Sequence, residues 1–428
     1  MPLEDFLPEM DRCSHCSYCK WIPLDKIKSH RFAYGCPSIA YNNFNAYSAR
    51  GRYAVGKSLV LKEVDYTDKI VDTVFQCTMC GSCDVSCKVC RYNLQPLQMM
   101  GELRSKLVED GQVLPIHQRY VDSLRNEDNM RLEPKTARGK WADGLDVKIL
   151  GVESAQVLYH AGCRFSYDKE LQENARAAVM VLKDAGVDVG ILGADEMCCG
   201  AKAYQMGFFK EFDEAANKVI NNWKRLGVKT VVTSCANCFY AFNRLYPKLG
   251  ADFEVLHVAQ YIDRLIKDGR IKFTGRVPLR VTYHDPCHLG RQGEAYEPWD
   301  GKEVKVRNQI VTYDPPKPRY NGTKGIYDAP RDVLKSIPGI ELVEMERNRE
   351  YAWCCGAGGG AKEAYPEFSD WTASERIEEA VATGAEAIVT ACSSCERNFI
   401  EAASAAKENI KVYDIALLVS RAMKGGEF

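Results

Sequence analysis

Pairs of adjacent cysteines occur twice in this chain, and glycine follows each pair at once. The two triplets are Cys198, Cys199 and Gly200, and Cys354, Cys355 and Gly356. Adjacent cysteines are poorly placed to form a mutual disulfide, because their side chains diverge. They also do not fit one zinc ion, whose thiolate ligands usually stand two to four residues apart. The triplets therefore indicate a metal group that uses touching thiolates, and uses them twice.

Two further cysteine groups lie near the N-terminus. One is a C-x₂-C-x₂-C triple followed later by Cys36 and Pro37, and the other is C-x₂-C-x₂-C-x₃-C. This spacing is typical of cubane [4Fe–4S] clusters, and in two-cluster ferredoxins the fourth cysteine of each motif serves the other cluster. By that rule we expect one cubane on Cys13, Cys16, Cys19 and Cys87, and the other on Cys77, Cys80, Cys83 and Cys36. A pair of zinc sites is the alternative, but three such close thiolates fit three cluster corners better than a zinc tetrahedron.

The total of 19 cysteines bears on the compartment. The N-terminal stretch is acidic and has no apolar core of a secretory signal, so we expect a reducing cytoplasm. Clustered cysteines there indicate metal ligands or redox groups rather than a disulfide framework. Cys90 is left over, either as a spare thiol or as a replacement for Cys87 among the ligands.

The elements that must position these cysteines change character along the chain. Residues 1–125 are expected to form a mainly helical domain, in which Ile70, Val71, Val74 and Phe75 share one helical face. Residues 126–146 are polar and contain Pro134 and two glycines, so we expect a linker.

From residue 147 onward, strand and helix patterns alternate. Strands are expected at 155–160, 187–192 and 228–235, with amphipathic helices at 169–186 and 213–227 between them. This alternation predicts a parallel sheet with helices on its faces. Cys163, Cys235 and Cys238 then lie at or just after the carboxyl ends of strands, where open parallel sheets bind their ligands.

The same region is a tandem repeat. "YHAGC" at 159–163 matches "YHDPC" at 283–287, and "VVTSCANC" at 231–238 matches "IVTACSSC" at 388–395. The second copy carries about 32 extra residues between its first cysteine and its CCG triplet. The sequence therefore predicts two copies of one α/β unit, at 147–272 and 273–428, the second with an insert at about 291–330 that is rich in Pro, Tyr and basic residues.

Each copy offers five cysteines in the order C, CC, C-x₂-C. This arrangement resembles the cysteine-rich CCG motif of the heterodisulfide reductase B subunit and its relatives. The first copy fits the motif's gaps, and the second exceeds the first gap by the length of the insert. Because a two-cubane part precedes two CCG units, the whole chain resembles the D subunit of heterodisulfide reductase, a fusion of C-like and B-like parts. It is also similar to a component of class II benzoyl-CoA reductase complexes.

The resemblance implies a noncubane [4Fe–4S] cluster in each copy. The implied ligands are Cys163, Cys198, Cys199, Cys235 and Cys238 in the first copy, and Cys287, Cys354, Cys355, Cys392 and Cys395 in the second. Four clusters would then use 18 of the 19 cysteines. The implied fold class is α/β, with a helical two-cubane ferredoxin-like domain before two CCG domains that contain parallel sheets.

The resemblance also implies an iron–sulfur oxidoreductase component in a hetero-oligomeric complex of anaerobic metabolism. We expect a relay between a partner and the noncubane clusters, within an electron-bifurcating assembly. The partner is a flavin-containing protein like the A subunit of heterodisulfide reductase, or another electron-transfer subunit, because the chain shows no flavin or nicotinamide fingerprint. The alternative is a catalytic reductase that splits a small disulfide between the two noncubane clusters.

Composition excludes other classes of protein. The net charge of −1 gives no electrostatic case for nucleic acid. We find no apolar run of 18 residues, so we expect no transmembrane segment.

Three other signals have two interpretations each. The glycines of "CCGAGGGAK" lack the spacing of a nucleotide fingerprint, so they indicate close backbone approach to a cluster rather than a phosphate loop. His160 and His284 hold matched positions and either serve the clusters, by hydrogen bonds to sulfur or proton transfer, or are packed core residues. Lys317 and Arg319 of the insert face an acidic substrate or partner, or only solvent.

Overall fold

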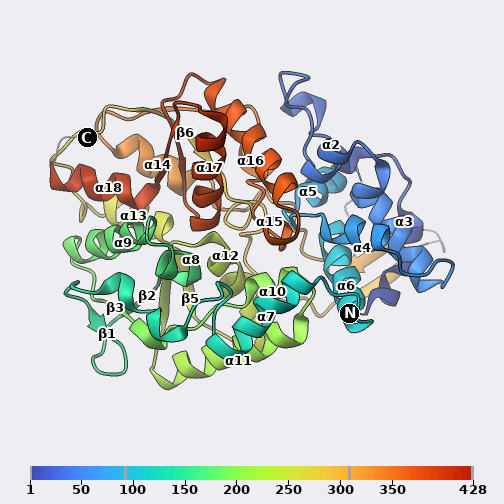
Figure 1. The fold of residues 1–428 in the computed structure, drawn as a ribbon, viewed down its shortest axis with the longest axis horizontal. Helices are drawn as coiled ribbons and strands as arrows, with labels where there is room; N and C mark the ends of the chain where they lie inside the picture. The colour runs from blue at the N-terminus through green and yellow to red at the C-terminus, as the bar shows by residue number, and fades with distance from the viewer. Residues whose placement is uncertain (1, 91–93, 307–309, 426–428) are drawn as a thin grey trace.

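The fold is described from a computed structural model, which covers residues 2–90, 94–306 and 310–425. Figure 1 shows three parts: a helical N-terminal part on the right in blue, a first α/β part at the lower left in green, and a second at the upper left in orange and red. This arrangement confirms the predicted fold class.

The N-terminal part is built from short helices and 3₁₀ turns. Proline stands in the first turn of four of the helices (α1, α2, α6 and α7), where its missing N–H costs no hydrogen bond. Val74 and Phe75 are fully buried, as the helical pattern predicted. The α-helices are α1 (Leu7–Arg12), α2 (Pro37–Asn42), α3 (Ala49–Val60), α4 (Asp68–Phe75), α5 (Ser82–Cys90), α6 (Pro96–Glu109) and α7 (Pro115–Glu127).

The first copy forms a five-stranded parallel sheet in the order β1-β3-β2-β4-β5. Its strands are β1 (Lys148–Ile149), β2 (Val157–His160), β3 (Val189–Ile191), β4 (Thr230–Thr233) and β5 (Glu254–His257). Its helices are α8 (Gly162–Tyr167), α9 (Gln172–Asp184), α10 (Ala201–Gln205), α11 (Phe209–Arg225), α12 (Ala236–Tyr240) and α13 (Val258–Lys267). The three strands and two helices predicted in this region are all present.

The second copy repeats the topology of the first. Its parallel sheet has the order β11-β10-β6-β9, which matches β5-β4-β2-β3 of the first copy. Its strands are β6 (Arg280–His284), β9 (Glu341–Val343), β10 (Ala387–Thr390) and β11 (Lys411–Asp414). Its helices are α14 (Asp328–Ser336), α15 (Ala361–Ala364), α16 (Pro366–Val381), α17 (Ser393–Ala406) and α18 (Ile415–Lys424).

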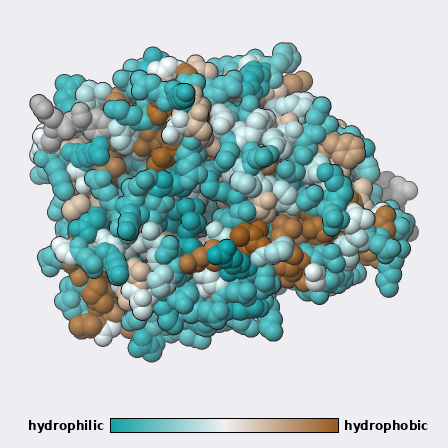
Figure 2. All heavy atoms as spheres, viewed as in Figure 1, coloured by the Kyte–Doolittle hydropathy of each residue, from teal (hydrophilic) through white to brown (hydrophobic). Residues whose placement is uncertain are grey.

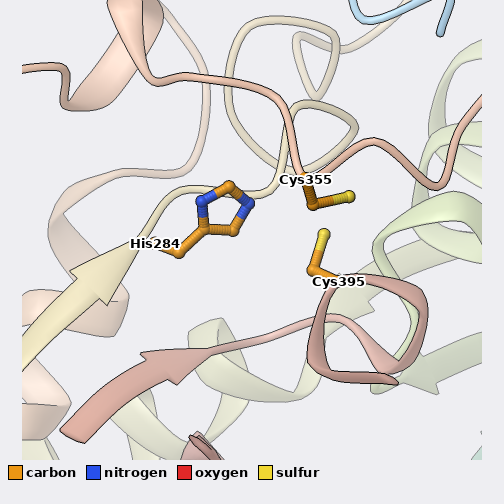
Figure 3. A group of neighbouring side chains, drawn as sticks. All are labelled: His284, Cys355 and Cys395. Atoms are coloured by element: carbon orange, nitrogen blue, oxygen red, sulfur yellow. The ribbon is translucent and has the colours of Figure 1, made fainter. Parts of the chain in front are cut away.

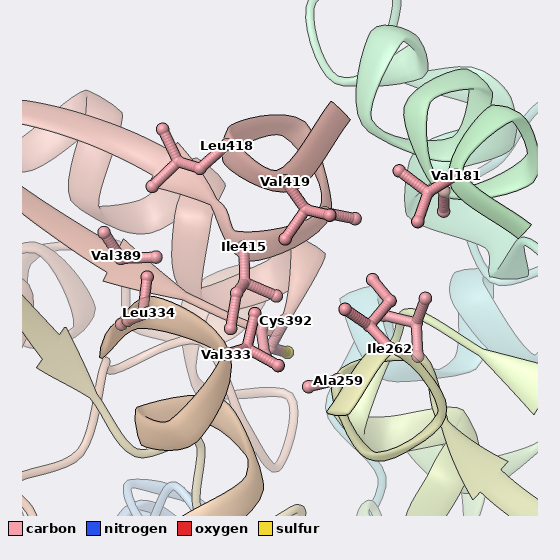
Figure 4. Packing of buried hydrophobic residues seen from close by; sticks show 14 of the residues in the cluster. Val181, Ala259, Ile262, Val333, Leu334, Val389, Cys392, Ile415, Leu418 and Val419 are labelled. Carbon is pink, nitrogen blue, oxygen red and sulfur yellow. The ribbon is translucent and has the colours of Figure 1, made fainter. Parts of the chain in front are cut away.

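One hydrophobic core joins the two copies. Val181 of α9 and Ile262 of α13 belong to the same buried cluster as Val333 of α14 and Ile415 of α18. Figure 4 shows these side chains converging from both copies. The two α/β units are therefore packed as one body, with their sheets held in a fixed relation.

Residues 126–146 connect the helical part to the first copy, and a few of their side chains are buried. Arg138 is 1% exposed and Trp141 is 2% exposed, and both lie under the first sheet's helices and loops. The polar composition did not reveal this burial, because the charge of Arg138 is satisfied inside the protein by the Glu196 carboxylate.

The insert adds a feature that the sequence did not predict. It contains an antiparallel hairpin of β7 (Lys302–Val306) and β8 (Ile310–Asp314). Lys88 Nζ of α5 donates a 2.7 Å hydrogen bond to the carbonyl of Tyr320, so the insert packs on the N-terminal part. Lys317 lies over the rings of Trp299 and Tyr313.

The surface in Figure 2 is mostly hydrophilic, with hydrophobic residues gathered in a band below its centre. Within residues 2–90, 94–306 and 310–425, no helix is both long enough and apolar enough to span a bilayer.

Candidate iron–sulfur sites

The first N-terminal cysteine triple meets a cysteine from the other motif. Cys87, on α5, is close enough to Cys13, Cys16 and Cys19 that all three act on it electrostatically. Burial is the largest cause that raises the pKa of the Cys87 thiol, and these three cysteines add to it. The structure therefore brings together the four cysteines that we assigned to the first cubane.

The second triple meets Cys36 in the same way. Burial, opposed by the Arg52 charge and aided by Cys80 and Cys77, raises the pKa of Cys36 to about 11. The buried side chain of Arg52 fixes this meeting, because it donates to Ser38 Oγ at 2.7 Å and to the Gln76 carbonyl at 2.9 Å. These bonds tie the segment after Cys36 to the segment before Cys77.

In the first α/β copy, the five cysteines come from three strand ends. Cys163 follows β2, the adjacent pair follows β3, and Cys235 and Cys238 follow β4. Neighbouring thiols interact with one another, Cys163 with Cys198, Cys199 with Cys238, and Cys238 with Cys235. The carboxyl edge of the sheet thus gathers one set, as parallel strand topology predicts.

The second copy gathers its set by the same plan. Contacts between thiols run from Cys287 to Cys354, from Cys355 to Cys395 and from Cys395 to Cys392. The eighteen cysteines whose side chains the structure describes are all free thiols. Cys90 is the remaining one, and its side chain lies outside the described part. Five free thiols in contact fit a metal cluster better than they fit disulfides.

The glycine of each CCG triplet explains why the pair can share one site. Gly200 has φ +71° and Gly356 has φ +89°, a backbone conformation that other residues rarely adopt. The chain turns there, and the glycine N–H reaches back to the first cysteine, at 3.5 Å from Cys198 Sγ and 3.3 Å from Cys354 Sγ. A backbone N–H directed at sulfur is the kind of contact that stabilises a thiolate.

Contact among the thiols makes one cysteine in each pair more acidic. Hydrogen bonds from Cys198 and Cys238 lower the pKa of Cys199 to about 6 despite its burial. Hydrogen bonds from Cys354 and Cys395 lower the pKa of Cys355 well below its usual value. Thiolate is the form that binds metal, and the same contacts raise the pKa of other thiols in each set, among them Cys238 and Cys395.

The cysteine sets also touch one another. Cys80 of the N-terminal part interacts with Cys354 of the second copy, and Thr78 Oγ1 lies 3.3 Å from Cys354 Sγ. Cys392 of the second copy is in contact with Cys235 of the first. The second copy's set therefore lies between the N-terminal set that contains Cys80 and the first copy's set.

The glycine-rich loop after Cys355 also lies at this contact. We expected its glycines to approach a cluster, but their nearest neighbours are backbone atoms. A Cβ on Gly358 would lie 2.4 Å from the Thr78 carbonyl oxygen, and one on Gly359 would lie 2.7 Å from the Cys77 carbonyl oxygen. The close approach is thus to the backbone of the second N-terminal motif. Only glycine lets the two segments come this near.

His284 is oriented toward the second set. Its Nδ1 accepts a 3.1 Å hydrogen bond from Arg376 Nε, so the neutral ring carries its proton on Nε2. A ring nitrogen lies within 4.8 Å of the sulfurs of Cys355 and Cys395, as Figure 3 shows. Burial and the Arg376 charge lower the pKa of His284 well below its usual value, which keeps it neutral. This geometry suits hydrogen-bond donation to sulfur.

The matched His160 has different surroundings. Its ring packs edge-on against Trp223 and Phe242, and its Nδ1 lies 3.7 Å from Glu196 Oε2. Burial lowers the pKa of His160. The two copies are therefore not equivalent at this position, and the interpretation as a packed core residue fits His160 better than His284.

Sequence reasoning missed the cation that contacts the first set. Arg138 Nη1 lies 3.0 Å from Cys163 Sγ, and its other nitrogens bind Glu196, with the shortest separation 2.7 Å. Glu196 in turn accepts the N–H groups of Ala161 and Gly162, at 2.9 Å each. The tandem repeat could not reveal Arg138 and Glu196, because Ala352 occupies the position of the second copy that matches Glu196.

The five cysteines of the first set line a partly open pocket, whose space a cluster bound there would occupy. It has about 590 Å³ of empty space, including solvent at its mouth. The second copy contributes Ala357, Gly359 and Ser394 to its wall. The pocket thus lies where the two copies meet.

Comparison with known proteins agrees with this geometry. Residues 9–90 match the family model of a 4Fe-4S dicluster domain, and residues 157–243 and 281–400 both match that of a cysteine-rich domain named CCG. The D subunit of the dihydromethanophenazine:CoB–CoM heterodisulfide reductase of Methanosarcina mazei is 31% identical over 97% of this chain and 95% of its own. The chain belongs to the family of heterodisulfide reductase D subunits.

Relatives outside the D-type subunits extend the comparison. A probable iron–sulfur-binding oxidoreductase of Bacillus subtilis is 28% identical over 85% of this chain and 49% of its own. The B subunit of the fumarate reductase (CoM/CoB) of Methanothermobacter marburgensis is 27% identical over 82% of this chain and 62% of its own. This D-type homologue is therefore an iron–sulfur oxidoreductase subunit, and it binds iron–sulfur clusters.

The fold of the D-type homologue also has a counterpart among solved structures. A hypothetical protein from Helicobacter pylori aligns with a TM-score of 0.53 at 11% identity, over 89% of this chain and 68% of its own. At this identity the likeness concerns the fold alone.

Proposed function

We propose that this chain relays electrons through four [4Fe–4S] clusters, two cubane and two noncubane. The clusters, when bound, supply one-electron transfer at closely spaced centres. The proposed ligand sets are Cys13, Cys16, Cys19 and Cys87; Cys77, Cys80, Cys83 and Cys36; Cys163, Cys198, Cys199, Cys235 and Cys238; and Cys287, Cys354, Cys355, Cys392 and Cys395. The protein contributes the position, the hydrogen bonds and the dry surroundings of each set.

The observation that carries the proposal is the contact between sets. Cys80 interacts with Cys354, whose Sγ lies 3.3 Å from Thr78 Oγ1, and Cys392 interacts with Cys235, so the second N-terminal set, the second copy's set and the first copy's set are neighbours in that order. A relay needs such an order. The same order implies that the second copy's set exchanges electrons with the N-terminal part. The first copy's set is then the last in the series.

The exposure of the first N-terminal set supports an interaction with a partner protein. Cys16, in the first N-terminal set, is exposed, so a redox group of another protein can approach that set closely. We propose that this partner is a flavin-containing protein like the A subunit of heterodisulfide reductase, or another electron-transfer subunit, in a hetero-oligomeric and electron-bifurcating complex in the cytoplasm. The class II benzoyl-CoA reductase complex is one assembly of this kind.

The proposal is tested first by metal content. Anaerobically prepared protein is expected to hold about 16 irons per chain, four for each cluster. Iron analysis and electron paramagnetic resonance after oxidation check this, because noncubane clusters should add a signal that two cubanes lack. About eight irons with only cubane signals would contradict the two noncubane clusters. Zinc in place of iron would contradict the assignment of all four clusters.

Catalysis of disulfide reduction is the second candidate function. The placement of the two noncubane sets favours it, because Cys392 of the second copy lies beside Cys235 of the first, and a disulfide held between the sets would give one sulfur to each. The isolated chain, supplied with an artificial one-electron donor, is assayed for turnover of small disulfides. Turnover above the rate of the donor alone would support catalysis, and its absence in cluster-loaded protein would leave the relay.

A further inference from the structure

Arg291 is a buried cation at the junction between the N-terminal part and the second copy. It follows Cys287 by four residues in the chain, and only 5% of it is exposed. Its Nε donates a 2.7 Å hydrogen bond to the carbonyl of Cys80, and its Nη1 donates at 2.8 Å to the carbonyl of Glu350. The guanidinium group therefore reaches from the second copy to the N-terminal set that contains Cys80.

The negative groups that act on Arg291 belong to two cysteine sets. Its hydrogen-bond acceptors are neutral carbonyls rather than carboxylates. Burial lowers the pKa of Arg291, but the thiols of Cys80, Cys287 and Cys354, together with the Tyr327 phenol, outweigh this effect and raise the pKa. Cys80 belongs to the second N-terminal set, and the other two cysteines belong to the second copy's set. The two sets thus share one cation.

One donor of this cation is left over. Among the described residues, Arg291 Nη2 is buried and has no hydrogen-bond partner. A buried donor without an acceptor is costly, and for a charged group the cost is larger. The sulfur atoms of a cluster bound at this junction would be suitable acceptors. The surroundings of Arg291 therefore fit a metal group in the neighbouring sets.

The first copy has no equivalent of this cation. Tyr167 occupies the position that matches Arg291 in the repeat. The cation of the first copy is Arg138, which contacts Cys163 and is bound at the same time by the Glu196 carboxylate. A shared cation is thus specific to the second copy, whose set is the one that adjoins the N-terminal part.

A shared cation has a use where two redox sites adjoin. Cys80 and Cys354 interact across the junction, so negative charge on one set acts on the other. Adding an electron to either site increases this repulsion, which is strong in a buried and weakly polar environment. A cation between the sites offsets the repulsion and stabilises the reduced state of both. Local charge and hydrogen bonds of this kind set the reduction potentials of iron–sulfur clusters.

We propose that Arg291 is the common counter-ion of the second N-terminal set and the second copy's set, and that its charge raises the reduction potential of both. It acts on the electron through the sets it adjoins, so it is a positioning residue rather than a catalytic one. The proposal rests on the proposed function, because both sets are taken to hold clusters. It adds the residue that makes this junction easier to reduce.

The test measures the potentials directly. Cluster-loaded protein is titrated with dithionite, which supplies the electrons, and each cluster is followed by electron paramagnetic resonance. In Arg291→Met, both clusters at the junction should become harder to reduce, by about tenfold in the equilibrium constant, or about 59 mV for one electron. The clusters of the other two sets should shift much less. Cys36→Ala, which should lack the second N-terminal cluster, identifies the signal of that cluster by its absence.

Two further variants separate the charge from the hydrogen bonds. Arg291→Gln retains a donor for the Cys80 carbonyl but no charge, so it should lower both potentials as Arg291→Met does. It also serves if Arg291→Met loses its clusters. Arg291→Lys retains the charge and should keep most of the parent potentials. Arg276→Met, at an exposed arginine elsewhere, is the matched control and should change nothing. Iron analysis of each variant shows that the clusters are present.

Unchanged potentials in Arg291→Met and Arg291→Gln at full iron content would overturn the proposal. A shift confined to one of the two sets would do the same, because the cation would then not be shared. An equal shift in Arg291→Lys would assign the effect to hydrogen bonds and would also contradict it. Rapid mixing of the parent protein with a donor tests the relay separately. Absence of electron transfer between the two parts, with the shifts as expected, would count against the relay and leave the role of Arg291 standing.

Discussion

At the scale of single residues, the sites depend on cysteines that the sequence reveals and on charges that it does not. The CCG pairs could be interpreted from the sequence because adjacent cysteines fit few kinds of site. Arg138 was not, since it lies in a polar stretch and its burial against Glu196 depends on the tertiary fold. The interpretation that His284, rather than His160, serves a cysteine set likewise depends on Arg376, a neighbour that is distant in the chain.

Cross-ligation of the N-terminal sets is the prediction that belongs to this scale. Cys36→Ala should remove the cluster of Cys77, Cys80 and Cys83, and Cys87→Ala should remove the other cubane, because each cysteine lies with the opposite motif. Each variant should lose about four irons. Iron analysis with electron paramagnetic resonance distinguishes the two losses.

Cys90→Ala serves as the control and should retain both cubanes. Loss of the cluster of Cys13, Cys16 and Cys19 in the Cys36 variant, with the other cubane intact, would show that each motif closes on itself.

At the scale of elements, the repeat made the α/β part predictable. Apolar runs such as 155–160 and 228–235 became β2 and β4, because buried parallel strands need continuous apolar residues. Cysteines that follow such strands then had to meet at one edge. The hairpin β7–β8 was not predictable in this way, since its Pro-, Tyr- and Lys-rich surroundings indicate a loop, and the strands exist only as partners of each other.

The glycine-rich loop gives the prediction for this scale. In Gly358→Ala, the new Cβ would meet the Thr78 carbonyl at 2.4 Å, so the loop must move away from the second N-terminal motif. We expect full iron content but slower reduction of the noncubane clusters by a donor that reduces the cubanes. Rapid-mixing spectroscopy measures this rate.

Gly101→Ala, on α6, provides the comparison, because its new Cβ would make only an ordinary 3.5 Å contact with Phe209. It should transfer electrons at the parent rate. Equal rates in both variants would show that the loop's close approach does not control transfer between the two parts.

At the scale of the whole molecule, Arg104 joins all three parts. It is fully buried, and its guanidinium donates 2.7 Å hydrogen bonds to the carbonyls of Cys77, Gln205 and Gly359, which belong to the N-terminal part, the first copy and the second copy. Burial lowers the pKa of Arg104 to about 10, so it stays charged at neutral pH. No repeat or spacing in the sequence marks this residue.

Arg104→Met should destabilise the protein by about 3 kcal/mol or more, because several buried carbonyls lose a charged donor. Denaturant unfolding of cluster-loaded protein measures the loss, and an earlier separate transition of the N-terminal part would show where it acts. Arg119→Met, at an exposed arginine on α7, should stay within about 0.5 kcal/mol of the parent. A similar small effect for Arg104 would contradict this account.

The contact between Cys80 and Cys354 has a consequence for how the protein is made. Both thiols are buried, 7% and 2% exposed, at a junction between segments that are far apart in the chain. A scaffold protein that delivers preassembled iron–sulfur groups cannot reach either thiol once this junction has closed. As ligands of the proposed clusters, these thiols are accessible only before the N-terminal part packs on the second copy, so we expect the clusters to be inserted before the two parts dock.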